Sequence, residues 1–137
     1  MTPEAPDLPR KGRSPYINLL GIRFVAVEPG LCRCEIEADA ERHLNMQGYL
    51  HGGVCFSLMD TAMGASLHPL LGEGEGAVTL EIQINYLRSV TEGLLECEAR
   101  VVRRGKRVAF FEADVYCGGE LIAHGTGSYA IVEKRTS

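Results

Sequence analysis

Alternation of apolar and polar residues marks the clearest element of this chain. Apolar residues occupy every even-numbered position from Val78 to Tyr86, and polar residues stand between them, which is the period of a β-strand with one exposed face. The period of two shows no slip, so Thr79 is expected on the polar face of the strand. The sequence therefore predicts a regular strand over residues 78–86.

Five further segments have the composition and the flanking turns of strands. Pro29 and Gly30 form a turn between the first two, because proline presets φ and glycine supplies a positive φ. Glycine-containing turns separate the last three, which are predicted to be consecutive antiparallel strands. In the final one Gly125 and Gly127 share a face with Ala123, so another element is expected to pack closely there. The five segments are residues 22–27, 31–38, 94–103, 108–117 and 121–132.

Two segments are predicted to be helices. From Gly53 to about Leu67 the chain has no proline, and apolar residues lie nearly all the way round a helix, which is typical of a buried helix. A short helix is predicted earlier, with Ser14 at the N-cap, Pro15 at the first helical position and Gly21 at its end.

The order of these elements predicts the fold class. A helix, two strands, a buried helix and four strands with short connections indicate an α+β fold in which one antiparallel sheet curls around one central helix. The domain is expected to span residues 15–137. Residues 1–14 contain three prolines and almost no apolar side chains, so they are predicted to be a flexible tail.

Composition narrows the classes of protein further. A chain of 137 residues is one domain, and its net charge of −4 disfavours a nucleic-acid partner. No stretch approaches the roughly 18 apolar residues of a membrane helix, and no signal peptide is evident, so we expect a cytoplasmic protein without membrane contact. The five cysteines show no CxxC spacing, which disfavours disulfides and zinc. Cys32 and Cys34 share a strand face with Ile36, so both are expected to pack in the core.

One charged residue interrupts the apolar helix. Asp60 is flanked by Leu58, Met59, Ala62 and Met63, and carboxylates are rarely buried unless they are paired. A carboxylate in such surroundings marks a candidate reaction site. The alternative is that Asp60 is a partly exposed helix residue or pairs with an arginine.

A second candidate site lies where the same helix begins. The first N–H groups of a helix are unpaired, and Gly52 and Gly53 would let a polarised carbonyl approach them closely. The glycines alone favour the alternative, a plain loop-to-helix junction. Gly52 and Asp60 are eight residues apart, which is about 12 Å along a helix. If both act on one carbonyl, Asp60 of one subunit must therefore face Gly52 of another, which predicts at least a symmetric dimer.

Residues in and before this helix form one long motif, which consists of His43-Leu44-Asn45, Gly48, His51-Gly52-Gly53, Leu58, Asp60, Ala62 and Gly64. This motif resembles that of the phenylacetic-acid-degradation-type (PaaI-like) hotdog-fold thioesterases. The predicted order of elements is also that of the hotdog fold, so the resemblance extends from about Tyr16 to Val132.

This resemblance implies hydrolysis of an acyl-coenzyme A thioester to a free acid and coenzyme A, without a metal or a further cofactor. Asp60 would be the nucleophile or the general base, and would come from the partner subunit of a homodimer or a dimer of dimers. Gly52 would donate its N–H to the thioester oxygen, and Asn45 would position the water or that oxygen. A serine or threonine of the following strand assists in such enzymes, and Thr79 is the matching position.

His51 has two interpretations that the sequence leaves open. As the resemblance implies, it would hydrogen-bond near the thioester, whereas a loop histidine before a helix equally well caps backbone groups. A metal site formed by His43, His51 and Asp60 is not expected, because their spacing matches no common zinc motif.

Four cations in five residues interrupt an otherwise acidic domain. A solvated turn is the ordinary interpretation of such a run. The resemblance implies a second one, contact with the phosphates of coenzyme A. The four cations are Arg103, Arg104, Lys106 and Arg107.

Three hypotheses about function follow. The first is an acyl-CoA thioesterase, the second a hotdog protein that binds acyl-CoA as a sensor or carrier without turnover, and the third and weakest a hotdog hydratase. The acyl group is left open between aryl-acetyl and medium-chain groups, because Phe56, Met59, Met63 and Leu67 either line a pocket or belong to the core.

Overall fold

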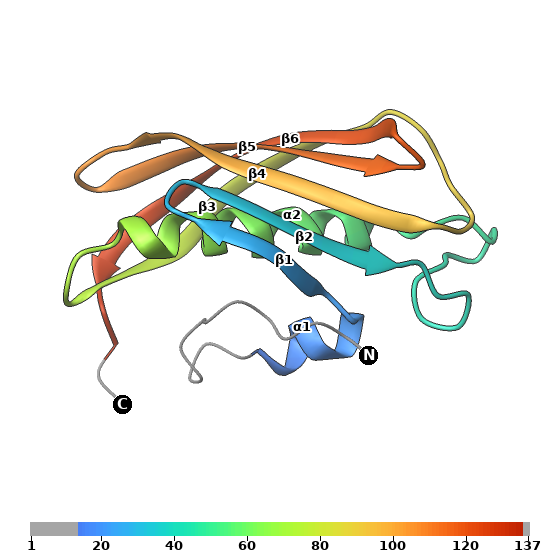
Figure 1. Cartoon of the computed structure of the whole chain (residues 1–137), viewed down its shortest axis with the longest axis horizontal. Coiled ribbons are helices and arrows are strands. Elements are labelled where there is room, and N and C mark those ends of the chain that lie inside the picture. Colours follow the sequence, from blue (N-terminus) through green and yellow to red (C-terminus); the bar gives the residue numbers. More distant parts are fainter. Residues whose placement is uncertain (1–13, 136–137) are drawn as a thin grey trace.

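The computed structural model describes residues 14–135, and its elements confirm the predicted α+β class. The six strands form one antiparallel sheet in the order β1-β2-β4-β5-β6-β3. Figure 1 shows α2 lying along one face of this sheet, with α1 beside the start of β1. The elements are α1 (Pro15–Leu20), β1 (Arg23–Glu28), β2 (Leu31–Glu37), α2 (Gly52–Leu67), the 3-10 helix η2 (His68–Leu70), β3 (Glu75–Tyr86), β4 (Leu94–Arg104), β5 (Val108–Cys117) and β6 (Glu120–Glu133).

The predicted start and end of α1 are confirmed. The Ser14 side chain accepts hydrogen bonds from the N–H groups of Tyr16 and Ile17, so it is the N-cap. Gly21 ends the helix with a φ of 78°, a left-handed conformation that glycine adopts without a Cβ penalty. The predicted tail lies outside the described residues, except for Ser14.

The core lies between α2 and the inner face of the sheet. Met59 and Met63 of α2 pack on β6, where a Cβ at Gly125 or Gly127 would lie 2.7 Å from a methionine sulfur. The close approach predicted for these two glycines is therefore confirmed. Core packing is also confirmed for Cys32 and Cys34, and Cys55 and Cys97 are likewise buried and free.

Helix α2 is not buried on every side, so that prediction was wrong. Gly53 and Phe56 are exposed, and Asp60 and Gly64 are half-buried. These four residues lie three or four positions apart and therefore form one stripe along the helix. The sheet packs mainly on the opposite side of α2, where the helix residues are buried. The stripe is the part of α2 from which Asp60 reaches the surface.

Strand β3 contains a β-bulge, so the prediction of a regular period was also wrong. Thr79 is opposite Tyr129 on β6, but the adjacent residue Ser128 is opposite Glu81. Leu80 is therefore one extra residue in the β3–β6 ladder. Strand β3 lies at the edge of the sheet, where bulges are common.

The bulge reverses which residues of β3 face the helix. After it, Ile82 packs against the core, as the alternation predicts. Before it, Thr79 contacts α2, whereas Val78 and Leu80 are 52% and 57% exposed. Thr79 therefore lies on the side opposite to the one that the sequence predicts.

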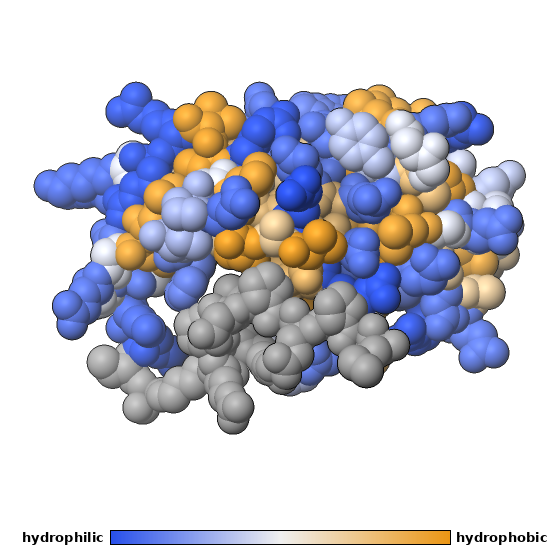
Figure 2. Space-filling model, viewed as in Figure 1, coloured by the Kyte–Doolittle hydropathy of each residue, from blue (hydrophilic) through white to orange (hydrophobic). Residues whose placement is uncertain are grey.

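Within residues 14–135, no helix combines the length and the apolar character needed to cross a bilayer. On the face seen in Figure 2, hydrophobic residues form patches interspersed with hydrophilic side chains.

Candidate active site

The Asp60 carboxylate is held by two hydroxyl groups from the sheet. Thr79 Oγ1 donates a hydrogen bond to Asp60 Oδ1 at 2.8 Å, and the Tyr129 hydroxyl donates to the same oxygen. Oδ2 accepts no hydrogen bond from any residue between 14 and 135. The residue is half-buried. The sequence left open whether Asp60 is partly exposed or pairs with an arginine. It is partly exposed, and its carboxylate is hydrogen-bonded to two hydroxyls rather than to an arginine.

Tyr129 is a site residue that sequence reasoning missed. Its side chain is 5% exposed, and its ring packs on Phe111 with the ring centroids 4.8 Å apart. Burial, together with the Asp60 carboxylate, raises the pKa of the Tyr129 hydroxyl well above its usual range. A signal was present, because the alternation of Gly125 and Gly127 places Tyr129 on the same face.

An open pocket of about 690 Å³ lies beside Asp60. At its wall Tyr16 of α1 and Ser57 of α2 are hydrogen-bonded through their hydroxyl oxygens, 2.7 Å apart. Phe56 lines this pocket, whereas Met59, Met63 and Leu67 are fully buried in the core. The aromatic lining consists of Tyr16, Phe24, Phe56 and Tyr129.

The start of α2 presents a backbone donor. His51 is the N-cap, and its Nδ1 accepts the N–H of Gly53 at 2.9 Å, so the capping interpretation describes its position in the structure. The Gly52 N–H donates to no group in the described part of the chain. The Tyr86 hydroxyl donates to the Gly52 carbonyl oxygen at 2.7 Å, and a Cβ on Gly52 would lie 3.0 Å from this side chain. Glycine therefore fits this contact best.

Gly52 and Asp60 lie on the same helix, as predicted. Helix α2 spans Gly52–Leu67 without a break, so the two residues are about 12 Å apart along its axis. Within one chain, the free Gly52 N–H and the Asp60 carboxylate therefore cannot contact one carbonyl group.

Asn45 shapes the loop before α2. Its side-chain oxygen accepts hydrogen bonds from the N–H groups of Gln47 and Tyr49, at 2.9 and 3.1 Å. The oxygen is therefore occupied by the loop, and the Nδ2 amide group is the part of Asn45 left to meet a ligand.

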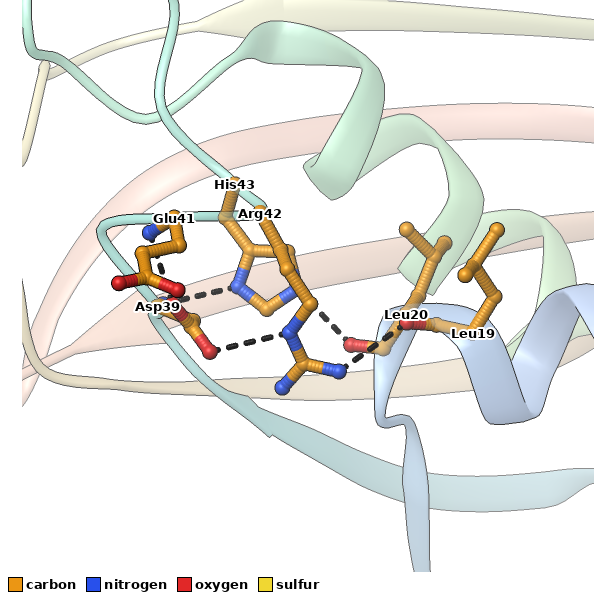
Figure 3. Close-up of polar contacts among 6 residues, drawn as sticks. All are labelled: Leu19, Leu20, Asp39, Glu41, Arg42 and His43. Atoms are coloured by element: carbon orange, nitrogen blue, oxygen red, sulfur yellow. Dashed lines mark hydrogen bonds and ion pairs between the residues drawn. The ribbon is translucent and has the colours of Figure 1, made fainter.

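His43, another residue of the motif, is part of a buried hydrogen-bond network near the end of α1 (Figure 3). It is 1% exposed, and its Nδ1 accepts the Asp39 N–H at 2.9 Å while Nε2 lies 2.9 Å from the Leu20 carbonyl oxygen. Arg42 adds an ion pair to Asp39 and a hydrogen bond to the Leu19 carbonyl oxygen. This network joins the loop to the end of α1, so His43 does not face the pocket.

The predicted basic turn lies away from the start of α2 within one chain. Arg104 is half-buried and forms an ion pair with Glu75, the first residue of β3. Tyr86, the last residue of that strand, contacts Gly52. The basic turn and the start of α2 therefore lie at opposite ends of β3. The other three cations are exposed. Nowhere in residues 14–135 do three His, Cys, Asp or Glu side chains gather as metal ligands do.

Comparison with known proteins connects this geometry to one family. The model of the Thioesterase superfamily matches residues 47–123, more than half of the chain. Acyl-coenzyme A thioesterase 13 of Homo sapiens is 34% identical over 116 residues, which cover 80% of this chain and 80% of that protein. The proofreading thioesterase EntH of Klebsiella pneumoniae is 31% identical over 97 residues, 71% of this chain and 70% of its own.

Solved structures share the architecture. A conserved protein of Pseudomonas aeruginosa superposes with a TM-score of 0.85 at 36% identity, covering 92% of this chain and all of that one. The phenylacetic acid degradation protein PaaI of Thermus thermophilus gives a TM-score of 0.79 at 27% identity, covering 85% of this chain and 98% of its own. The predicted hotdog fold and the motif resemblance are both confirmed.

Proposed function

The chain belongs to the thioesterase superfamily and is a thioester hydrolase, and we propose that it hydrolyses an acyl-coenzyme A with Asp60 as the reacting carboxylate. The observation that carries this proposal is the arrangement at Asp60, where two hydroxyls hold one carboxylate oxygen and the second oxygen is free beside an open pocket. The aromatic lining suits an aryl-acetyl or a medium-chain acyl group.

The reaction needs few groups. Asp60 takes a proton from water, the water oxygen attacks the thioester carbonyl carbon, and the carbon–sulfur bond breaks. The coenzyme A sulfur leaves and takes up the proton that Asp60 accepted, which gives the free acid and the thiol. In the alternative route Asp60 itself attacks the carbonyl and displaces the coenzyme A sulfur, and water then hydrolyses the resulting anhydride, which releases the acid and restores Asp60. In both routes the Gly52 N–H stabilises the charge on the carbonyl oxygen, and the Nδ2 of Asn45 orients the water or that oxygen.

The site is proposed to form between two subunits. Because Gly52 and Asp60 are about 12 Å apart on one helix, each would act with its counterpart from a second copy. The exposed stripe of α2 and the free edge of β3 are the surfaces that this second copy would cover. The exposed cations Arg103, Lys106 and Arg107 are proposed to meet the phosphates of coenzyme A, and no metal takes part.

Thiol release from a panel of acyl-CoAs tests the activity and the role of Asp60. The Asp60→Asn variant keeps the shape and the acceptor oxygen of the side chain but loses the base, so we expect a rate about 10² to 10⁴ times lower. Glu96→Gln, the same acid-to-amide change on the exposed face of β4, is the matched control. Equal rates for wild type and Asp60→Asn contradict the proposal. Saturable binding of acyl-CoA without thiol release favours the sensor or carrier hypothesis.

Mixed dimers test the shared site. One chain carries Asp60→Asn, and the other carries Gly52→Pro, which removes the N–H. When the two are refolded together, half of the dimers are mixed and one of their two sites has an intact Gly52 and an intact Asp60. We expect activity to return to about a quarter of the wild-type rate by this statistical count. A mixture as inactive as its parts contradicts a site shared between subunits.

A further inference from the structure

We propose that Tyr129 is a positioning residue that holds the Asp60 carboxylate by Oδ1 and thereby presents Oδ2 to the substrate. This inference rests on the proposed function of Asp60. It assigns a role to a residue of the last strand, which lies 69 positions from Asp60 in the sequence.

The sheet brings the two hydroxyl donors together. Thr79 and Tyr129 are directly opposite each other on β3 and β6, and the bulge at Leu80 turns Thr79 to the side that Tyr129 already faces. Both hydroxyls reach the same oxygen of Asp60. Two donors on one oxygen fix the rotation of the carboxylate, because any turn about its last bond would break both hydrogen bonds.

The single proton of the Tyr129 hydroxyl has two acceptors within reach. The Asp60 backbone carbonyl oxygen is 2.6 Å away, and Oδ1 of the same residue is also in contact. A charged acceptor forms the stronger hydrogen bond. When Asp60 is ionised, the Tyr129 hydroxyl therefore donates its hydrogen bond to the carboxylate rather than to the backbone carbonyl oxygen. Both acceptors within reach of this proton therefore belong to Asp60.

Tyr129 is the more deeply buried of the two donors. Its ring is buried and packs on Phe111 inside the sheet, whereas Thr79 lies exposed on the edge strand. Because its pKa is raised by burial and by Asp60, the hydroxyl stays protonated over the working range of pH and remains a donor.

The Tyr129→Phe variant isolates the hydroxyl, because it keeps the ring and its contact with Phe111. With acyl-CoA as substrate we expect kcat to fall about 10- to 100-fold, the loss usual for one hydrogen bond to a charged group, and KM to change less than twofold. A fall in kcat without a matching change in KM separates the alignment of the carboxylate from a loss of substrate binding. Tyr116→Phe, the same change on the exposed face of β5, should leave kcat and KM unchanged.

A double variant separates a role through Asp60 from a general one. If Tyr129 acts through Asp60, adding Tyr129→Phe to Asp60→Asn lowers the residual rate no further. A wild-type kcat for Tyr129→Phe, or losses that multiply in the double variant, would overturn the inference while leaving the role of Asp60 intact. A wild-type rate for Asp60→Asn alone would instead overturn the proposed function, and the inference with it.

Discussion

The start and the middle of helix α2 each contribute one group to the proposed chemistry, and they are built differently. At the start, the group is a backbone N–H of Gly52, and the neighbouring His51 caps the next N–H. In the middle, the group is the Asp60 side chain, which is held by hydroxyls from β3 and β6, 19 and 69 residues away.

The difference shows how each group is kept in place. The helix start depends mainly on local geometry, since the helix itself leaves its first N–H groups unpaired. The Asp60 carboxylate depends on the sheet, because its orientation is set by a cross-strand pair that exists only once β3 and β6 have assembled. Changes at the helix start should therefore act on a single donor, and changes around Asp60 on the alignment of a side chain.

The largest effect is expected when the Gly52 N–H, the proposed donor at the start of α2, is removed. Gly52→Pro does so at the first position of a helix, where proline is tolerated, and His51 already has the extended ψ of 132° that a residue before proline requires. Gly52→Ala is the matched control, because it adds the same Cβ against Tyr86 but keeps the N–H. We expect kcat for Gly52→Pro to be about 10² to 10³ times lower than for Gly52→Ala. Equal kcat values would remove Gly52 from the mechanism.

A smaller loss is expected when the second hydroxyl at Asp60 is removed. Thr79→Val keeps the shape of the side chain and deletes the donor, so kcat should fall about tenfold, measured by thiol release. Thr79→Ser keeps the hydroxyl and should retain most of the rate. If Thr79→Ser loses as much as Thr79→Val, the methyl group matters rather than the hydrogen bond.

His51 distinguishes stability from chemistry at the helix start. His51→Ala removes the cap of Gly53 and should lower the free energy of unfolding by about 1 kcal/mol, whereas His51→Asn replaces the cap with another good one. Urea titrations measure this difference. If His51 acts only as the N-cap, the His51→Asn variant should hydrolyse acyl-CoA at nearly the wild-type rate. A large loss of rate in a stable His51→Asn variant would show that the imidazole acts on the substrate.

The smallest effect is expected from deleting Leu80. Removal of this extra residue leaves Thr79 opposite Tyr129 and Ile82 facing the core, with a regular ladder between them. The free energy of unfolding should change by less than about 1 kcal/mol, and the rate of thiol release by less than twofold. An inactive but folded variant would show that the bulge itself, and not only the direction of Thr79, shapes the site.

Local signals predicted much of this molecule from the sequence. Ser14, Gly21 and the apolar run of α2 indicate their elements through neighbours within a few residues, and the motif placed Asp60 and Gly52 on one helix. The direction of Thr79 was missed, because the alternation in β3 does not show where its partner strand skips a residue. Tyr129 was missed for a related reason, since its contact with Asp60 depends on the pairing of distant strands.

The bulge in β3 also affects how this chain is aligned with other members of its family. Thr79 and Ile82 both face α2 although three positions separate them, whereas in an unbroken strand two residues on one face are two positions apart. A relative whose strand lacks the extra residue would carry its hydroxyl two positions before the equivalent of Ile82. An alignment without a gap at Leu80 would then pair Thr79 with the wrong residue of that relative and report the hydroxyl as missing.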